Sequence, residues 1–283
     1  MTSLTYATMS NRPAPNRLTD TAALTRNRAR ARSDALFLQK AARDEIEDRL
    51  ELVNKPFHSA GIIAAFPELW QDRIPDSTVM GEAEVLPLAA AAHDLVIHSM
   101  GLHWANDPVG QLIQCRRALK PDGMLLAVSL GGQTLHELRS VLAEAEVAVQ
   151  GGLSPRVAPM GEVRDLGALL QRAGLALPVA DSVMLTARYR SMWHLMRDLR
   201  HMGEGNALDA RLRHPTRRAV LNRAADLYAE AFSHPDGGIA ATFEMIVLTG
   251  WAPDESQPKP LRPGSAQARL ADALRTDETP LSD

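Results

Sequence analysis

The sequence predicts an α/β protein with a doubly wound, mostly parallel sheet, and three observations lead to this prediction. Short apolar runs alternate with amphipathic stretches along the 283 residues, and strands joined by right-handed helical crossovers lie parallel to one another. The run Asp94–Ser99 is apolar on both faces, as in a buried parallel strand. Polar loops follow expected strands at Met100–Asn106 and Gly131–Gly132, and sheets of this kind bind ligands at the carboxyl ends of their strands.

The first part of the chain predicts one surface helix and two short strands ahead of Asp94. Leu36, Ile46 and Leu50 recur at helical spacing among charged residues, which is typical of a helix that covers a domain. The short apolar segments that follow predict strands separated by a helical turn. In order, these elements are a helix at Ser33–Leu52, a strand at Ser59–Phe66, one or two helical turns at Pro67–Gln71 and a strand at Ser77–Met80.

The segment after Asp94 contains clear helix signals. Asp107 can cap free N–H groups, and Pro108 loses no hydrogen bond at a first helical position. Thr134 and Glu137 have the spacing of a capping box, so we expect a helix to begin there. The predicted elements are a helix at Pro108–Leu119, a turn at Lys120–Gly123, a strand at Met124–Leu130 and a helix at Thr134–Gln150.

The last part of the chain predicts two more strands and three more helices. Gly174 can close a helix in the left-handed conformation. The elements are a loop at Gly151–Met160, helices at Val163–Arg172, Ser191–Met202 and Thr216–Ala231, and strands at Pro178–Arg188 and Thr242–Trp251. The domain organisation expected from this pattern is a disordered leader at 1–32, a domain at 33–251, and a proline-rich tail at 252–283 with a short helix at Gln267–Leu274.

Composition narrows the classes of function. The chain is 45% hydrophobic and 23% charged, which is ordinary for a globular protein, and its net charge of −3 gives no reason to expect nucleic acid as a partner. The single cysteine, Cys115, excludes an internal disulfide and a cysteine-based zinc site. No histidine pair has metal-ligand spacing, so no metal is expected. No apolar run reaches the roughly 18 residues of a membrane span.

The amino-terminal residues 1–32 are rich in serine, threonine and arginine and contain one acid, Asp20. This composition fits a mitochondrial transit peptide, and it also fits a bacterial leader that continues into a basic helix at Thr25–Lys40. Because arginine dominates the 31 basic residues of the whole chain, the bias says little about targeting. We favour a bacterial cytoplasmic protein, with the mitochondrial matrix as the alternative.

Several segments resemble class I S-adenosylmethionine-dependent methyltransferases of the Methyltransf_11 type. The segments are Asp94–Ile97, Leu102–Asp107 and Arg116–Gly123. Within that superfamily the chain resembles the group that contains the malonyl-carrier-protein methyltransferase of the biotin pathway and the mitochondrial complex I assembly factor that hydroxylates an arginine. The segments that resemble the assembly-factor branch are Ser154–Val157, Met196–Asn206 and Leu248–Gln257. The resemblance implies a Rossmann-like methyltransferase fold, S-adenosylmethionine as cofactor and a protein or carrier-bound substrate.

The amino-terminal part departs from the family pattern. The resemblance implies a glycine-rich loop after the first strand, where glycine lets the backbone approach the methionine part of the cofactor. The corresponding stretch, Gly61–Trp70, contains one glycine, which precedes the apolar residues of the strand. No acid stands at the end of a following strand to hold the ribose hydroxyls. Too few residues separate Ala65 from Asp94 for two strand–helix units, so one unit is expected to be shortened or missing.

Four residues are candidates for cofactor binding. The segment Gly81–Pro87 resembles the family's acidic–x–Glu–x–Leu–Pro segment, whose first acid contacts the adenine amine, and this resemblance gives Glu82 that role. The alternative is that Glu82 is a solvent-facing loop acid. Met100, His103 and Trp104 follow the next strand, where such enzymes place groups that face cofactor and substrate. Otherwise Trp104 covers the end of the sheet and His103 hydrogen-bonds a loop carbonyl.

A group of basic residues near the later helices has two interpretations. It could form a basic pocket for an acidic substrate or carrier protein, or it could be a helix face paired with nearby acids, and we favour the second. The basic residues are Arg188, Arg190, Arg197, Arg200 and His201, and the acids are Asp198, Glu204 and Asp209. His98, inside a strand, is expected to be a core histidine.

Two hypotheses about function follow. The first is a methyltransferase whose cofactor cleft is rebuilt around Ala65, Glu82 and Met100–Asn106; because methyl transfer from a sulfonium depends mainly on alignment, no catalytic residue is predicted. The second is a catalytically degenerate member, a pseudoenzyme that binds or assembles a protein client such as a respiratory-complex subunit. The missing glycine loop and the resemblance to the assembly-factor branch favour the second hypothesis for this chain.

Overall fold

The computed structural model describes residues 17–258 and 276. The chain divides into two units, Met1–Pro253 and Asp254–Asp283, and the sheet, its helices and two cavities belong to the first. In the second unit, the backbone N–H of Ser256 donates to the Asp254 carboxylate at 2.9 Å. The helix predicted at Gln267–Leu274 lies outside the described residues. Within the described part of the chain, no helix has the length and apolar character needed to cross a membrane.

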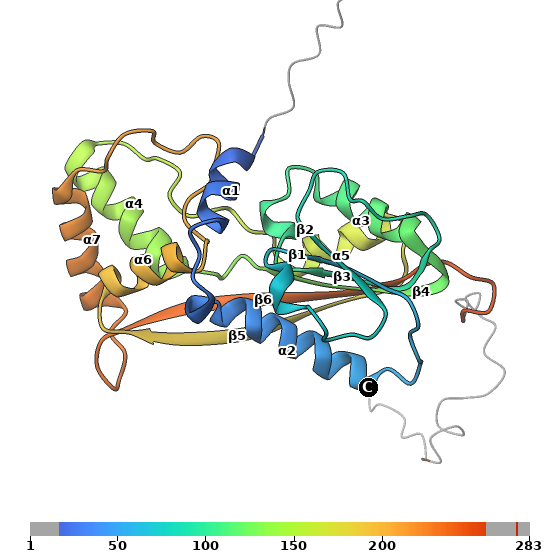
Figure 1. Cartoon of the computed structure of the whole chain (residues 1–283). Coiled ribbons are helices and arrows are strands. Elements are labelled where there is room, and N and C mark those ends of the chain that lie inside the picture. The colour runs from blue at the N-terminus through green and yellow to red at the C-terminus, as the bar shows by residue number, and fades with distance from the viewer. Residues whose placement is uncertain (1–16, 259–275, 277–283) are drawn as a thin grey trace, which may run out of the picture. The chain divides into compact units, whose positions relative to one another are not determined.

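Six strands form one mixed sheet in the order β2-β1-β3-β4-β6-β5 (Figure 1). The strands are β1 Ala60–Ala64, β2 Ser77–Gly81, β3 His93–Ser99, β4 Leu119–Leu130, β5 Ala176–Tyr189 and β6 Ile239–Trp251. Strands β1 to β4 pair in parallel, and β6 runs antiparallel to both β4 and β5. The predicted doubly wound, mostly parallel α/β fold is therefore confirmed, and the carboxyl ends of β1 to β4 meet at one edge of the sheet.

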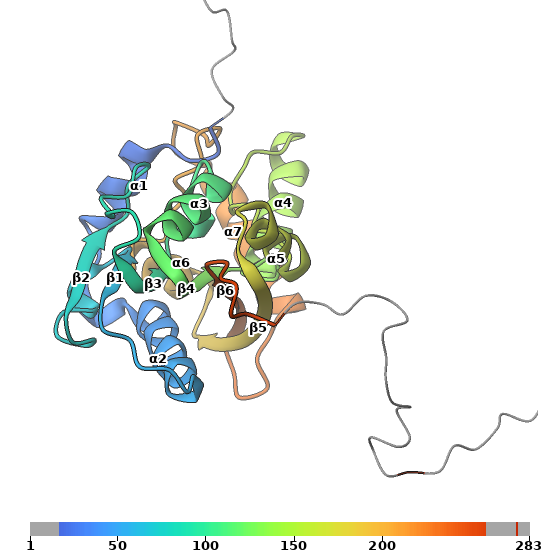
Figure 2. The same ribbon diagram turned by 90° about the vertical axis from the view of Figure 1, so that its right-hand side faces the viewer.

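Helices cover both faces of this sheet (Figure 2). They are α1 Thr21–Arg28, α2 Phe37–Leu52, α3 Pro108–Ala118, α4 His136–Gln150, α5 Val163–Arg172, α6 Met192–His201 and α7 Arg218–Ala231, with short 3₁₀ turns η1 Ser33–Ala35, η2 Pro67–Leu69 and η3 Leu102–Trp104. Alternate strand residues point to opposite faces. In β4, Leu126 and Val128 join the core formed with α2, α4, α6 and α7, whereas Leu125 and Ala127 join the core formed with α3 and α5.

The connection between β1 and β2 is unusually short. It contains only η2, whereas parallel strands are usually joined through a helix. The sequence prediction that one strand–helix unit is shortened or missing is confirmed. Phe66 and Trp70 of this connection are buried, with 6% and 1% of their surfaces exposed. The segment that follows β1 therefore packs its side chains into the protein instead of leaving bare backbone at the strand end.

The predicted disorder of residues 1–32 is wrong for the part that the structure describes. Residues 21–28 form α1, whose N-cap Asp20 accepts a hydrogen bond from the backbone N–H of Ala23 at 3.0 Å. The backbone N–H of Asp20 donates to the Ala207 carbonyl at 2.8 Å, so the helix is attached to a distant loop. The basic helix expected at Thr25–Lys40 is likewise divided, because α1 ends before η1 and α2 begin.

The predicted capping box at Thr134 and Glu137 is also wrong. Helix α4 begins after Leu135, which has a φ of 54° and makes no side-chain cap. The Thr134 hydroxyl donates to the Glu244 carbonyl at 3.2 Å, and the Glu137 carboxylate accepts from the Thr242 hydroxyl at 2.5 Å. These two bonds connect the start of α4 and the residues just before it to β6. Buried polar groups need hydrogen-bond partners, and β6 supplies them here.

Candidate functional site

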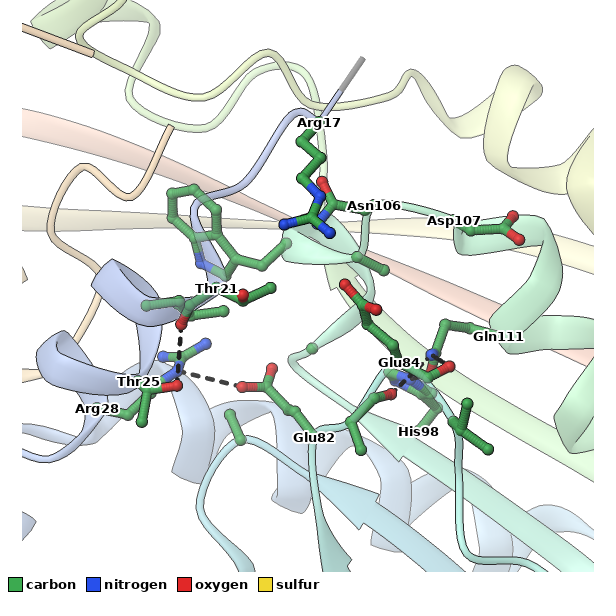
Figure 3. A pocket seen from close by; sticks show the side chains of 17 residues that line it. Arg17, Thr21, Thr25, Arg28, Glu82, Glu84, His98, Asn106, Asp107 and Gln111 are labelled. Carbon is green, nitrogen blue, oxygen red and sulfur yellow. Dashed lines mark hydrogen bonds and ion pairs between the residues drawn. The ribbon is translucent and has the colours of Figure 1, made fainter. Parts of the chain in front are cut away.

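A cavity of about 1010 Å³ lies where the carboxyl ends of β1, β2 and β3 meet. Ala65 follows β1, Glu82 follows β2 and Gly101 follows β3, and all three line the cavity. Residues of α1 line it as well (Figure 3). The remaining polar lining residues are Arg17, Thr21, Thr25, Arg28, Glu84, His98, Trp104, Asn106, Asp107 and Gln111. The cavity therefore occupies the place that the fold predicts for a ligand.

Arg28, in the last turn of α1, reaches the strand ends beside this cavity. Its guanidinium stacks 5.2 Å from the centre of the Phe66 ring, and its Nη2 donates to the Met100 carbonyl at 3.5 Å. Figure 3 shows the side chain pointing from α1 towards Glu82. The Nε atom lies 3.5 Å from the Glu82 carboxylate. A charged group of the chain itself thus fills the space directly beyond β1.

Glu204 holds Arg28 in this position. It is fully buried and accepts hydrogen bonds from Arg28 Nη1, from Trp104 Nε1 at 2.7 Å and from Gln39 Nε2 at 3.3 Å, and His103 Nε2 lies 3.4 Å away. Burial by itself would raise the pKa of the Glu204 carboxyl, but the Arg28 charge and the donated hydrogen bonds outweigh burial and hold the pKa well below its usual range. Glu204 is therefore a carboxylate at neutral pH.

Glu82 is the second acid beside Arg28, and its environment is different. Burial raises the pKa of the Glu82 carboxyl, which the nearby Arg28 opposes. Its Oε1 has no hydrogen-bond partner among the described residues. A Cβ at Gly101 would lie 2.6 Å from that oxygen, so glycine lets the Glu82 side chain keep this position. Glu82 combines burial, a raised pKa and an unpartnered oxygen in the wall of the cavity.

His98 and Gln111 lie on the opposite side of the cavity from Arg28 (Figure 3). His98 is fully buried, as predicted for a core histidine, and burial lowers its pKa to about 4. Its Nε2 lies 3.3 Å from Gln111 Oε1, while Gln111 Nε2 donates to the carbonyls of Ala83 and Glu84 at 2.8 and 3.0 Å. These bonds fix the loop that follows β2, and they keep a neutral imidazole at the cavity.

The four residues predicted from the sequence to bind the cofactor lie close to the cavity, but only two of them line it. Glu82 and Trp104 line the cavity. Met100 and His103 are buried behind it, with 0% and 8% of their surfaces exposed, and are absent from its lining. Contact of these residues with a cofactor stays a prediction.

The residues missed at the sequence level are Arg28 and Glu204. Arg28 stood in a leader whose arginines match the bias of the whole chain, and Glu204 was expected only to pair with basic residues of a later helix face. The acids expected to pair with a later helix face bond elsewhere: Glu204 with Arg28, Asp209 with Arg213 and Asp198 with Tyr189.

A second cavity, of about 600 Å³, lies on the other side of Trp104. Trp104 lines both cavities, Arg28 lines the first and Glu204 lines the second. The Arg28–Glu204 ion pair and the Trp104 indole therefore form the wall between the two cavities. This wall is held by charge-assisted hydrogen bonds, which are the stronger kind in proteins.

The sequence of this chain is similar to those of known proteins. Residues 59–127 match a methyltransferase domain. The mitochondrial arginine-hydroxylase NDUFAF5 of Danio rerio is 40% identical over 200 residues, which is 70% of this chain and 62% of that protein. The protein of the same name from Rattus norvegicus is 37% identical over 234 residues, which is 81% of this chain and 66% of that protein. The methyltransferase-domain match and the mixed six-stranded sheet support a class I S-adenosylmethionine-dependent methyltransferase fold for this chain.

Two further proteins are similar to this chain. The malonyl-[acyl-carrier protein] O-methyltransferase of a Methylovorus strain is 35% identical over 175 residues, covering 62% of this chain and 56% of that protein. The solved YcgJ protein of Bacillus subtilis is 13% identical with a TM-score of 0.47, covering 75% of this chain and 99% of that one. The chain spans less than two thirds of the length of the curated relatives described above.

The side chains of this methyltransferase-fold protein fit only part of S-adenosylmethionine. The methionine end of that cofactor needs close approach to the backbone after the first strand, where this chain has the buried Phe66 with Arg28 stacked above it. The adenine end is served better, because Glu82 Oε1 has no partner among the described residues and could accept from an amine. The whole cofactor does not fit these side chains as they are arranged, so no methyl-transfer step follows from the geometry.

Proposed function

We propose that this chain is a catalytically degenerate methyltransferase-fold protein that binds a protein client and does not transfer methyl groups. The observation that carries the proposal is the position of Arg28. Its guanidinium lies between Glu204 and Glu82 at the end of β1, where enzymes of this fold expose a glycine loop to the cofactor. Removing one partner of a buried ion pair lowers the free energy of unfolding by about 3–5 kcal/mol. A cofactor that displaced Arg28 would therefore have to offset a large loss of stability.

The nature of the client is proposed from the relatives. Two of the relatives described above are named arginine-hydroxylases, which supports a protein as the bound molecule. The sequence resemblance to a complex I assembly factor supports a respiratory-complex subunit. The same relatives are named mitochondrial, which supports the mitochondrial matrix as a location. The malonyl-carrier-protein methyltransferase described above comes from a bacterium, and the bacterial cytoplasm, the location favoured from the sequence, stays a prediction with the mitochondrial matrix as its alternative.

Calorimetric titration of S-adenosylmethionine and S-adenosylhomocysteine into the protein tests the proposal. We expect no saturable heat at millimolar ligand, because the methionine end of the cleft is filled by Phe66 and Arg28. Binding at micromolar affinity would overturn the proposal, since it would show that the cleft accepts the cofactor despite these side chains.

A pair of variants shows whether Arg28 is the obstacle. The double change Arg28→Gln with Glu204→Gln removes both charges together, so neither is left buried and unpaired. Gain of S-adenosylhomocysteine binding in this variant would identify the ion pair as the element that excludes the cofactor. Arg26→Gln, on the exposed side of the same helix, is the matched control and should behave as the unchanged protein.

A second candidate function, S-adenosylmethionine-dependent methyl transfer to a protein or carrier-bound substrate, is favoured by one observation. The cavity keeps about 1010 Å³ and is lined by Glu82, whose Oε1 has no hydrogen-bond partner among the described residues. If the unchanged protein binds the cofactor, Glu82→Ala should abolish that binding while far-ultraviolet circular dichroism shows a folded chain. Unchanged affinity would refute the role of Glu82 at the adenine amine.

A further inference from the structure

We propose that the second cavity is a binding site for an aliphatic carboxylate, with the hydrocarbon chain inside and the carboxylate at Arg30 and Arg200. This site is separate from the cleft at the strand ends, and the inference holds whether or not S-adenosylmethionine binds there. The cavity volume of about 600 Å³ lies within the roughly 300–1,000 Å³ range of small-molecule sites.

The inner walls of the cavity are apolar and buried. Leu130 ends β4 and Phe243 lies within β6, Leu138 and Leu142 come from α4, and Leu199 comes from α6. Each of these five has at most 7% of its surface exposed. Val157, Met160, Met196 and Leu221 add further apolar contacts. Such walls favour a hydrocarbon ligand, because burying apolar surface releases water from both partners.

The polar groups in the walls are already bonded to the protein. Asn27 Nδ2 donates to the Gly205 carbonyl at 3.0 Å, Asn206 Nδ2 donates to the Pro155 carbonyl at 2.9 Å and the Thr134 hydroxyl donates to Glu244. Arg156 is bonded to Glu146 at 2.6 Å and to Thr216. Glu204 is paired with Arg28. The interior therefore presents few groups for a ligand rich in hydrogen-bonding atoms, such as a sugar or a nucleoside.

Two arginines in the lining differ from the rest. Arg30 and Arg200 are exposed, and neither guanidinium has a partner among the described residues. They approach the cavity from different segments, Arg30 just beyond α1 and Arg200 in the last turn of α6. A guanidinium binds a carboxylate through two parallel hydrogen bonds. An apolar chamber with unpaired guanidinium groups at its rim matches a ligand with a hydrocarbon chain and one anionic end.

Tryptophan fluorescence provides a direct test, because Trp104 lies in the cavity wall. The protein is titrated with decanoate and with a decanoate that carries bromine near its methyl end, which quenches a nearby indole. We expect saturable quenching by the brominated acid and competition by plain decanoate. Trp104→Phe should lose most of the quenching, whereas Trp193→Phe, an exposed residue on α6 that does not line the cavity, should keep it. Absence of saturable quenching in the unchanged protein would overturn the proposal.

Arginine variants test the carboxylate end. Arg30→Gln and Arg200→Gln should each weaken decanoate binding by roughly tenfold, the value of one charge-assisted hydrogen bond, and should leave binding of decanol unchanged. Arg26→Gln and Arg197→Gln are matched controls, because both residues are exposed on the same segments and neither lines the cavity. Unchanged decanoate affinity in both Arg30 and Arg200 variants would overturn the assignment, and so would equal affinity of the unchanged protein for decanol and decanoate.

Discussion

The two cavities lie on either side of one wall, yet they differ in chemistry. The cavity at the strand ends is lined by two ionisable groups, Glu82 and His98. Burial raises the pKa of Glu82 and lowers the pKa of His98, so it favours the neutral form of each. The second cavity has an apolar interior, and its free charges lie at the rim. Both share Trp104. The shared wall, with Arg28 and Glu204 at its centre, therefore separates a polar cavity from an apolar one.

The difference has its origin in the sheet. The first cavity opens at the carboxyl ends of three parallel strands, β1, β2 and β3, where loops bring polar side chains and backbone groups together. The second is lined by Leu130 at the end of β4 and by Phe243 of β6, where α4 and α6 contribute apolar helix faces. The methyltransferase match covers residues 59–127, which includes the first three of these strands but not β6.

The largest expected effect comes from breaking the wall. Glu204→Ala removes the acceptor of Arg28 and Trp104, leaves a buried guanidinium without its main partner, and should lower the free energy of unfolding by about 3–5 kcal/mol in chemical denaturation. Asp209→Ala is the control, because Asp209 forms an exposed ion pair with Arg213, a kind worth about 0–1 kcal/mol. Similar small losses of unfolding free energy in both variants would mean that the Arg28–Glu204 pair contributes little to stability.

His98, in the polar cavity, should make the stability of the protein depend on pH. Its folded-state pKa of about 4 is below the ordinary value of 6.5, so the unfolded chain takes up a proton first, and stability present above the ordinary value is lost as pH falls towards 4. The shift corresponds to about 3 kcal/mol. Denaturation of His98→Gln between pH 7 and 4 should lack this loss. His58→Gln, an exposed histidine, should retain it, and identical curves for both variants would contradict a buried neutral His98.

The apolar cavity can be tested by truncating its wall. Leu138 lines it, whereas Leu112 is fully buried in the other core and lines neither cavity. Within the range of about 2–5 kcal/mol for such changes, Leu138→Ala should fall near the lower end and Leu112→Ala near the upper end, because Leu138 already lacks contacts on its cavity side. Equal unfolding free energies for the two variants would indicate that the second cavity is closed in solution.

The smallest effect concerns Glu82 and has the opposite sign from that of His98. Because the folded-state pKa of Glu82 is raised, its contribution to stability is present below the ordinary pKa and is lost as pH rises through the folded value. Glu82→Gln should therefore gain stability relative to the unchanged protein between pH 4 and 7. Glu84→Gln, at an exposed neighbouring acid, should show no such trend. A constant deficit of Glu82→Gln at every pH would show that Arg28 keeps Glu82 ionised.

Much of the fold could be predicted from local patterns. The apolar runs at β1 and β3 and the Asp107–Pro108 helix start specify elements through side-chain period and capping, which depend on neighbours in sequence. The capping box predicted at Thr134 is wrong because a distant segment competes with the local pattern. The Thr134 hydroxyl donates to Glu244 on β6, 110 residues away. The site was predictable only in outline: Glu82 and Trp104 lie at the cavity, while the identity of their partners depends on segments far along the chain.

The sequence by itself determined the alternation of strands and helices, the shortening of one strand–helix unit between Ala65 and Asp94, and the absence of a glycine loop after β1. Each depends on which residue types stand within a few positions of one another. Only the tertiary structure decided that Arg28 meets Glu204, 176 residues away, and that an apolar chamber forms behind Trp104. The pairing of charges and the volume left between helices depend on how distant segments pack, because a buried charge is stable only beside a partner that the fold brings to it.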